Sequence, residues 1–252
     1  IIRLPNIGEF STDRNNEDYN WLKRFILADV EKLNIWVDDC PQMLKFDCFK
    51  KLYTTRFSNG ETKYVDSANT YNSYTLLKEM NIRVCPYCED QFIEEVNLPD
   101  GKRRTMEFDH FYPKGNDEYP ALAMCFYNLV PSCITCNRIK LARQVGANPY
   151  SEDIESETNL SVDLPIGVNM DQVSQEDCEI KFNAIGKMIL NVSNLGLEDR
   201  YKHLKPLAYS LLSKKQKYPI EKLKELEKLG FGDVQSLKVD FFGQPRNIAK
   251  GK

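Results

Sequence analysis

The N-terminal part of the chain repeats apolar residues with the period of an α-helix. Large apolar side chains recur every three or four residues over 18–38 and again over 41–57, and a shorter segment with the same pattern covers 72–80. The Ser-Asn-Gly sequence at 58–60 predicts a turn between helices. We therefore expect a helical region over residues 1–81, whose apolar stripes form core and which carries no catalytic signature.

The C-terminal part has a different pattern. A loop-rich, acidic stretch covers 146–175, and two β-rich runs that flank a short glycine-containing turn predict a β-hairpin over 178–192. Helical patterns follow over 198–216 and in a Lys/Glu-rich segment that ends at Gly230. We expect residues 146–252 to form a C-terminal region of one hairpin and several helices.

Composition adds limits to this pattern. The 252 residues suffice for one or two domains with a real core, and the net charge of −3 does not by itself indicate a nucleic-acid-binding protein. No apolar stretch is long enough to span a membrane, and the first residues do not resemble a signal peptide. We expect a cytoplasmic protein with reduced thiols and no membrane association.

Four of the eight cysteines form two Cys-x-x-Cys pairs, Cys85 with Cys88 and Cys133 with Cys136. Each pair presents two thiolates from one tight turn, and two pairs can enclose a tetrahedral Zn²⁺ that has no open coordination position. The 44 residues between the pairs exceed the spacing of a simple zinc ribbon, so a folded insert is expected. A redox role and incidental core cysteines are the alternatives to structural zinc. The other four cysteines are expected to be buried small hydrophobic residues.

The insert contains an adjacent Asp109–His110 pair in the sequence FDHFYP. Neighbouring residues at the end of a strand point to opposite sides, so the pair can direct a carboxylate to a metal and an imidazole to another target. Asp109 offers an oxygen ligand suited to Mg²⁺, and His110 is suited to general base catalysis at neutral pH. The alternative is that His110 is a satisfied core or turn histidine. His203, the second histidine, is expected to be structural or exposed.

The order CPYC, FDHFYP, YNLVPSC and CNRIK over residues 82–145 resembles the zinc-bearing branch of the HNH endonucleases, also called ββα-metal nucleases. The resemblance implies an α+β protein in which helical flanks surround a small ββα core stabilised by a four-cysteine zinc site. It implies hydrolysis of phosphodiester bonds with one catalytic Mg²⁺ or Mn²⁺. An intact set of motif residues argues against a decayed, non-catalytic module, and an RNA substrate stays open.

The resemblance also assigns roles to individual residues. Asp109 and Asn137 are expected to bind the catalytic cation, His110 to act as general base, and Asn128 to orient the loop that carries the base. Basic side chains near the motif are candidates for phosphate contacts, although they could equally lie on a solvated helix face. These candidates are Arg138, Lys140 and Lys114.

Charge and flanking sequence suggest a partner. Seven basic and four acidic residues lie within 101–145, a local positive surplus in an acidic chain, which suits weak contact with DNA. The layout of the flanks and the sequence LGLEDRYKHLKPLAYSLL resemble the nuclease subunits of Septu-type anti-phage defence systems, which implies a hetero-complex with an ABC-type ATPase. The chain itself contains no GxxxxGK[ST] phosphate loop.

Overall fold

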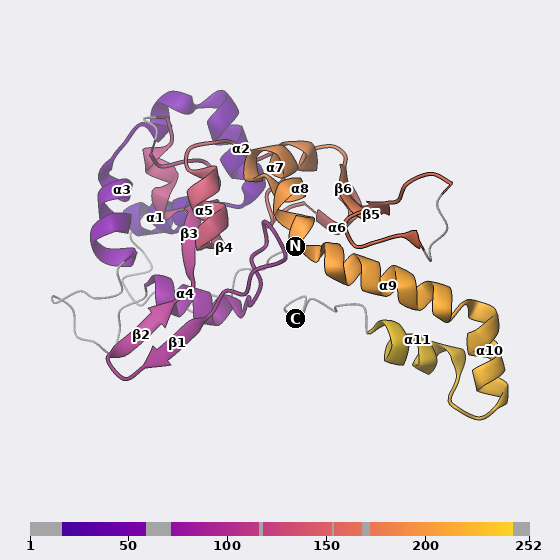
Figure 1. Ribbon diagram of the computed structural model, residues 1–252. Helices are drawn as coiled ribbons and strands as arrows, with labels where there is room; N and C mark the ends of the chain where they lie inside the picture. Colours follow the sequence, from indigo (N-terminus) through magenta and orange to yellow (C-terminus); the bar gives the residue numbers. More distant parts are fainter. Residues whose placement is uncertain (1–16, 59–71, 116–117, 153, 168–171, 244–252) are drawn as a thin grey trace.

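The structure is a computed structural model that describes residues 17–58, 72–115, 118–152, 154–167 and 172–243. Helices and three separate two-stranded antiparallel sheets make up these residues, which confirms the α+β class (Figure 1). The expected turn at 58–60 lies mostly outside the described residues.

The predicted helix over 18–38 is two helices, α1 (Glu17–Ile26) and α2 (Val30–Asp39). Asp29 causes the interruption, because its side chain accepts a hydrogen bond from the backbone N–H of Lys32 and so caps a new helix. The stripe of apolar residues continues across the break, which is why the sequence suggested one helix. The prediction over 72–80 is confirmed by α4 (Ser73–Met80), which Asn72 caps.

The segment from Pro41 to Phe57 is also divided. It contains a 3₁₀ turn η1 (Pro41–Leu44), a short helix α3 (Cys48–Leu52) and one π-helical turn, η2 (Tyr53–Phe57). The π turn directs Tyr53 and Phe57 into the interior, where both are buried. Single π turns inside helices often accompany functional sites.

Two antiparallel strand pairs follow the first cysteine pair, and the second of them ends at Cys133. Strands β1 (Glu95–Leu98) and β2 (Gly101–Arg104) form a hairpin whose two-residue turn consists of Pro99 and Asp100. Strands β3 (Met106–His110) and β4 (Leu129–Cys133) pair in the register Met106 to Cys133 and His110 to Leu129. Helix α5 (Ile134–Lys140) follows β4 directly and packs on both strands.

Short 3₁₀ segments fill the connection between these two strands. They are η3 (Pro120–Met124) and η4 (Phe126–Asn128). The first of them is buried throughout, and its Ala123 carbonyl lies 3.1 Å from Nε2 of His110 at the end of β3.

The predicted hairpin over 178–192 is only half correct. Its first strand is β6 (Glu179–Ala184), but this strand pairs with β5 (Thr158–Asp163), which comes from the stretch expected to be a loop. The second half forms helix α7 (Met188–Leu195). Met188, Asn191 and Leu195 are buried at helical spacing, and Gly196 ends the helix with a left-handed conformation.

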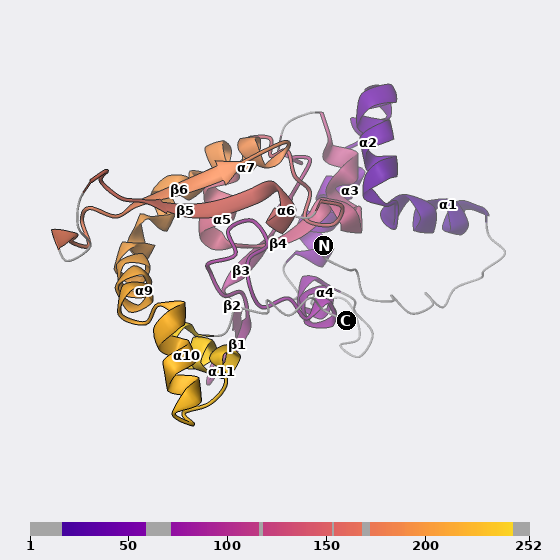
Figure 2. The same cartoon turned by 90° about the vertical axis from the view of Figure 1, so that its right-hand side faces the viewer.

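The remaining helices all lie in the part of the chain after residue 145. They are α6 (Ile154–Glu157), α8 (Leu197–Arg200), η6 (Tyr201–Leu204), α9 (Lys205–Lys217), α10 (Ile220–Lys228) and α11 (Val234–Phe242). The single helix predicted over 198–216 is divided into α8, the 3₁₀ turn η6 and α9. The helix predicted to end at Gly230 is present as α10, whereas α11 was not predicted. Helices α9–α11 reach away from the part of the molecule that carries the cysteine pairs, and we call them the C-terminal arm (Figures 1 and 2).

One hydrophobic cluster combines residues from all three predicted regions, including Leu76, Phe108 and Leu195. The N-terminal helices and the start of the C-terminal region therefore pack on the same core as the central motif. The boundaries at 81 and 145 stay predictions. No helix among the described residues is long and apolar enough to cross a membrane.

Candidate functional site

The four cysteines of the two pairs meet in one place. All four are buried, their sulfur atoms lie within 4.8 Å of one another, and Sγ of Cys88 lies 4.0 Å from Sγ of Cys133. A tetrahedral Zn²⁺ with Zn–S bonds of about 2.3 Å would hold its ligands about 3.8 Å apart. These residues can therefore hold a zinc ion, with every coordination position filled by sulfur.

Local structure presents each pair. Cys85 and Cys88 lie in a turn closed by the isolated bridge between Val84 and Phe92. Cys133 is the last residue of β4 and the N-cap of α5, where its sulfur accepts a hydrogen bond of 3.3 Å from the backbone N–H of Cys136. A zinc ion at this site would therefore join the turn that carries Cys85 and Cys88 to the junction of β4 and α5.

The other cysteines are unequal in burial. Cys125 and Cys178 are buried, as expected for small hydrophobic residues, but Cys40 is half-buried and Cys48 is exposed. The expectation was wrong for Cys48, which begins the short helix α3 on its solvent side.

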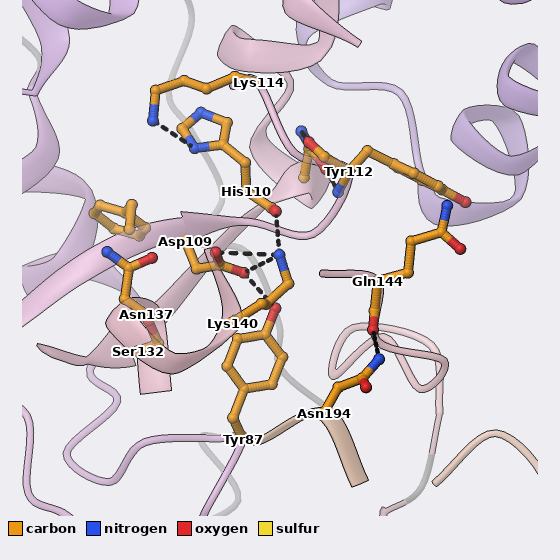
Figure 3. Close-up of polar contacts among 12 residues, drawn as sticks. Tyr87, Asp109, His110, Tyr112, Lys114, Ser132, Asn137, Lys140, Gln144 and Asn194 are labelled. Atoms are coloured by element: carbon orange, nitrogen blue, oxygen red, sulfur yellow. Dashed lines mark hydrogen bonds and ion pairs between the residues drawn. The ribbon is translucent and has the colours of Figure 1, made fainter. Parts of the chain in front are cut away.

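Asp109 lies at the end of β3 and points into the interior. Its Oδ2 accepts a hydrogen bond of 2.8 Å from the Tyr87 hydroxyl and lies 3.0 Å from Nζ of Lys140 (Figure 3). Its Oδ1 lies 3.2 Å from the same Nζ. Burial raises the pKa of Asp109, and the Lys140 ammonium opposes that rise. The pairing with a buried cation favours the ionised carboxylate.

His110 points to the opposite side of the strand end. Its Nε2 lies 3.1 Å from the Ala123 carbonyl, and its Nδ1 lies 3.2 Å from Nζ of Lys114 (Figure 3). Because a protonated lysine can only donate, Nδ1 is the acceptor and Nε2 carries the hydrogen. Burial lowers the pKa of His110 well below its usual value, and the nearby Lys114 ammonium adds to this effect.

Asn128 is fully buried and binds the segment that follows His110. Its amide nitrogen donates to the carbonyls of Leu122 (3.0 Å) and Tyr112 (3.2 Å). Its oxygen accepts a 2.7 Å hydrogen bond from the backbone N–H of Tyr112. The side chain therefore ties the 110–112 segment to η3, an arrangement compatible with the orienting role that the HNH resemblance implied.

Asn137 lies on α5, close to the Asp109 carboxylate. Its amide nitrogen donates to Oε2 of Glu107 at 2.5 Å, so its oxygen is turned toward Asp109 (Figure 3). Glu107 was not predicted as a site residue. The available signal was its position two residues before Asp109, since alternate residues of a strand share a face.

The three basic candidates differ in exposure. Arg138 is exposed on α5, and Lys114 is half-buried beside the His110 ring. Lys140 has no exposed surface, because its ammonium is enclosed by Asp109 and by the His110 carbonyl at 2.7 Å. The structure thus excludes the solvated helix face that was the alternative for Lys140, and the predicted phosphate contact of Lys140 stays a prediction that this enclosure disfavours. Its methylene stem packs inward as α5 lies on the two strands.

Two tyrosines near the Asp109–His110 pair were not predicted. Tyr87, the third residue of CPYC, binds Asp109, and nothing in the motif spacing marks it. Tyr53 comes from the region without a catalytic signature, and its ring meets His110 edge-on at 4.5 Å. The Lys114 ammonium lies 4.8 Å above the Tyr53 ring. The N-terminal helices therefore supply one wall of the site.

His203 is remote from this pair. It is exposed and contacts the Arg200 carbonyl and Asp90, as expected for a surface histidine.

Comparison with known proteins finds a relative that is similar to part of this chain. "Septu protein PtuB" from Bacillus thuringiensis is 32% identical to this chain over 125 residues. The aligned part covers 49% of this chain and 41% of the relative, so the chain spans less than half of the length of that protein. No known family model matches the chain, and no solved structure is significantly similar to it.

Proposed function

We propose that this protein is a metal-dependent endonuclease of the HNH type, which hydrolyses DNA phosphodiester bonds. The observation that carries the proposal is the arrangement of side chains at the end of β3. On one side of the strand His110 faces Lys114, and on the opposite side Asp109 faces the side-chain oxygen of Asn137 (Figure 3). The order of two antiparallel strands and a helix agrees with the ββα arrangement that the motif implies.

We further propose that the nuclease is the effector of a Septu-type anti-phage defence complex. The similarity to PtuB over half of the chain supports this assignment. An ABC-type ATPase is the proposed partner subunit, as the resemblance of the flanking sequence to Septu-type nuclease subunits implies.

The proposed cation ligands are Asp109 and Asn137. Oδ2 of Asp109 contacts both Tyr87 and Lys140, whereas Oδ1 lies 3.2 Å from Nζ of Lys140 and faces the Asn137 side chain (Figure 3). A carboxylate oxygen and an amide oxygen are ligands that Mg²⁺ or Mn²⁺ accepts together with water. When bound, the cation would stabilise the charge that develops on the phosphate and on the leaving 3′ oxygen.

The proposed general base is Nδ1 of His110. The Ala123 carbonyl holds the hydrogen on Nε2, which leaves the Nδ1 lone pair available for a proton of the attacking water. As the water oxygen bonds to phosphorus, the bond from phosphorus to the 3′ oxygen breaks. Lys114 covers Nδ1 in the free protein, and a phosphate oxygen offers its ammonium a stronger acceptor.

Plasmid cleavage tests this function. Supercoiled DNA is incubated with Mg²⁺ or Mn²⁺ and with wild type, His110→Ala or His203→Ala, the last being a matched control at the exposed histidine. We expect cleavage by wild type and His203→Ala and none by His110→Ala. Equal cleavage by all three proteins would contradict the assignment of the base. Parallel reactions with RNA decide the substrate, and reactions with the co-purified ATPase decide whether it is required.

A second candidate function is a non-catalytic zinc module that binds nucleic acid or protein. The buried ion pair of Asp109 with Lys140 favours it, because an ammonium already neutralises the carboxylate. Binding of Mn²⁺, measured by electron paramagnetic resonance and lost in Asp109→Asn, would reject this alternative. Zinc as the one bound metal, with no cleavage even beside the ATPase, would reject the nuclease.

A further inference from the structure

An arginine from outside the motif contacts the cysteine cluster. Nη1 of Arg200 lies 3.1 Å from Sγ of Cys136, a hydrogen bond between residues 64 positions apart. Arg200 is the last residue of α8 and is half-buried. A guanidinium is a permanent donor and a permanent cation, so it suits an anionic sulfur acceptor.

The next residue contacts the other cysteine pair. The hydroxyl of Tyr201 donates to the backbone carbonyl of Cys88, and its ring meets Phe182 of β6 edge-on at 4.8 Å. Tyr201 is buried. Two consecutive residues at the α8–η6 junction therefore reach both cysteine turns at once.

Electrostatics give this contact a function. Four thiolates around one Zn²⁺ carry a net charge of −2, and all four cysteines here are buried. Hydrogen bonds and cations around the ligands stabilise such a site, and loss of one such partner typically weakens metal binding about 10- to 100-fold. A cluster of neutral thiols would offer Arg200 a much weaker acceptor.

We propose that Arg200 is a positioning residue of the zinc site and that zinc occupancy fixes the C-terminal arm to the rest of the molecule. Helix α9 follows η6 without a linker, so the direction of the arm is set where Arg200 and Tyr201 bind the cysteine turns (Figure 1). The zinc site then has two roles. It joins the two cysteine turns, and through Arg200 and Tyr201 it anchors α8 and η6, from which the C-terminal arm begins. This inference does not depend on nuclease activity.

Zinc affinity tests the first part. Competition with a chromogenic chelator is measured for the full-length wild type, Arg200→Ala, Arg200→Lys and Lys202→Ala. The last variant is a matched control, because Lys202 lies two residues away, is exposed and pairs with Asp199. We expect affinity about 10- to 100-fold lower for Arg200→Ala, an intermediate loss for Arg200→Lys, which keeps the charge without the planar fork, and no change for Lys202→Ala. Affinities of Arg200→Ala and Arg200→Lys within about twofold of wild type would overturn the proposal.

Hydrogen exchange tests the second part with the unmodified protein, so it does not rely on any variant folding. Removal of zinc by the chelator should raise exchange in residues 197–204 and in the first turns of α9, together with the cysteine turns. Loss of protection in residues 85–88 and 133–136 alone, with 197–204 unchanged, would overturn the coupling. Neither measurement uses DNA, so a failure here is distinguishable from a failure of the proposed nuclease function.

Discussion

Nζ of Lys140 lies 3.0 Å from Oδ2 of Asp109, and the two side chains are 0% and 4% exposed. Lys140 ends helix α5 and Asp109 lies near the end of strand β3, so this ion pair fastens the helix to the strand end that carries His110. The Lys140 ammonium also donates to the His110 carbonyl. The pair therefore fixes the backbone on which both proposed catalytic side chains are mounted.

The first prediction concerns this pair. Lys140→Met should lower the free energy of unfolding by about 3–5 kcal/mol, because it leaves the Asp109 carboxylate buried without a cation. The double variant Asp109→Asn with Lys140→Met should recover much of the loss, since no charge remains buried. Urea unfolding of wild type, both single variants and the double variant gives the coupling energy. Additive losses would show that the pair contributes no interaction energy.

The second prediction concerns the pH dependence of stability. The pKa of His110 is well below its usual value of about 6.5 because of burial and Lys114. Between the folded and unfolded pKa values, the unfolded chain binds a proton that the folded chain does not. The free energy of unfolding should therefore fall as the pH drops below about 6.5, by up to about 1.4 kcal/mol per pH unit.

Urea unfolding in Mg²⁺-free buffer between about pH 5 and 8 measures this slope. His110→Gln removes the titrating group, and its difference from wild type isolates the contribution of His110 from that of Asp109 and other acids. Parallel curves for the two proteins would show that His110 titrates equally in both states.

Much of the candidate site could be predicted from local spacing. The two Cys-x-x-Cys turns each fix a pair of ligands, and the Asp109–His110 dipeptide diverges because adjacent strand residues point apart. These relations depend on a few neighbouring residues. The periodic helices at 72–80 and before Gly230 were predictable for the same reason.

The missed features depend on contacts between distant segments. Strand β6 pairs with β5, about twenty residues earlier, where the sequence suggested a loop, and the segment after β6 could bury Met188 and Leu195 only as a helix. Tyr53 reaches His110 through a π turn that no apolar pattern specifies. Lys140 looked like an exposed helix residue because its sequence position does not reveal the carboxylate behind it.

The third prediction concerns Glu107 and follows from the proposed cation site. Its carboxylate accepts the Asn137 amide N–H at 2.5 Å and so turns the Asn137 oxygen toward Asp109. Glu107→Ala should weaken Mn²⁺ binding about 10- to 100-fold, whereas Glu107→Gln, whose side-chain oxygen can still accept this hydrogen bond, should lose little.

Electron paramagnetic resonance titration with Mn²⁺ measures both variants, with Glu179→Gln at an exposed carboxylate as the control. Equal losses in Glu107→Ala and Glu107→Gln would indicate that the Glu107 charge contributes directly and that it does not merely orient Asn137.

The fourth prediction separates the three basic candidates by the salt dependence of DNA binding. Each phosphate contact steepens the dependence of log Kd on log salt concentration by about 0.9 on duplex DNA. Lys114 lies beside the Nδ1 face of His110 and Arg138 is exposed on α5, so Lys114→Met and Arg138→Ala should each reduce the slope by about that amount.

Lys140 is enclosed by Asp109 and the protein backbone, so its removal should leave the slope unchanged. The double variant Asp109→Asn with Lys140→Met is the suitable test protein, because it avoids an unpaired buried charge, and fluorescence anisotropy in Ca²⁺ at several salt concentrations gives the slopes. A slope reduced by about 0.9 in this double variant would show that Lys140 leaves its buried position to bind DNA.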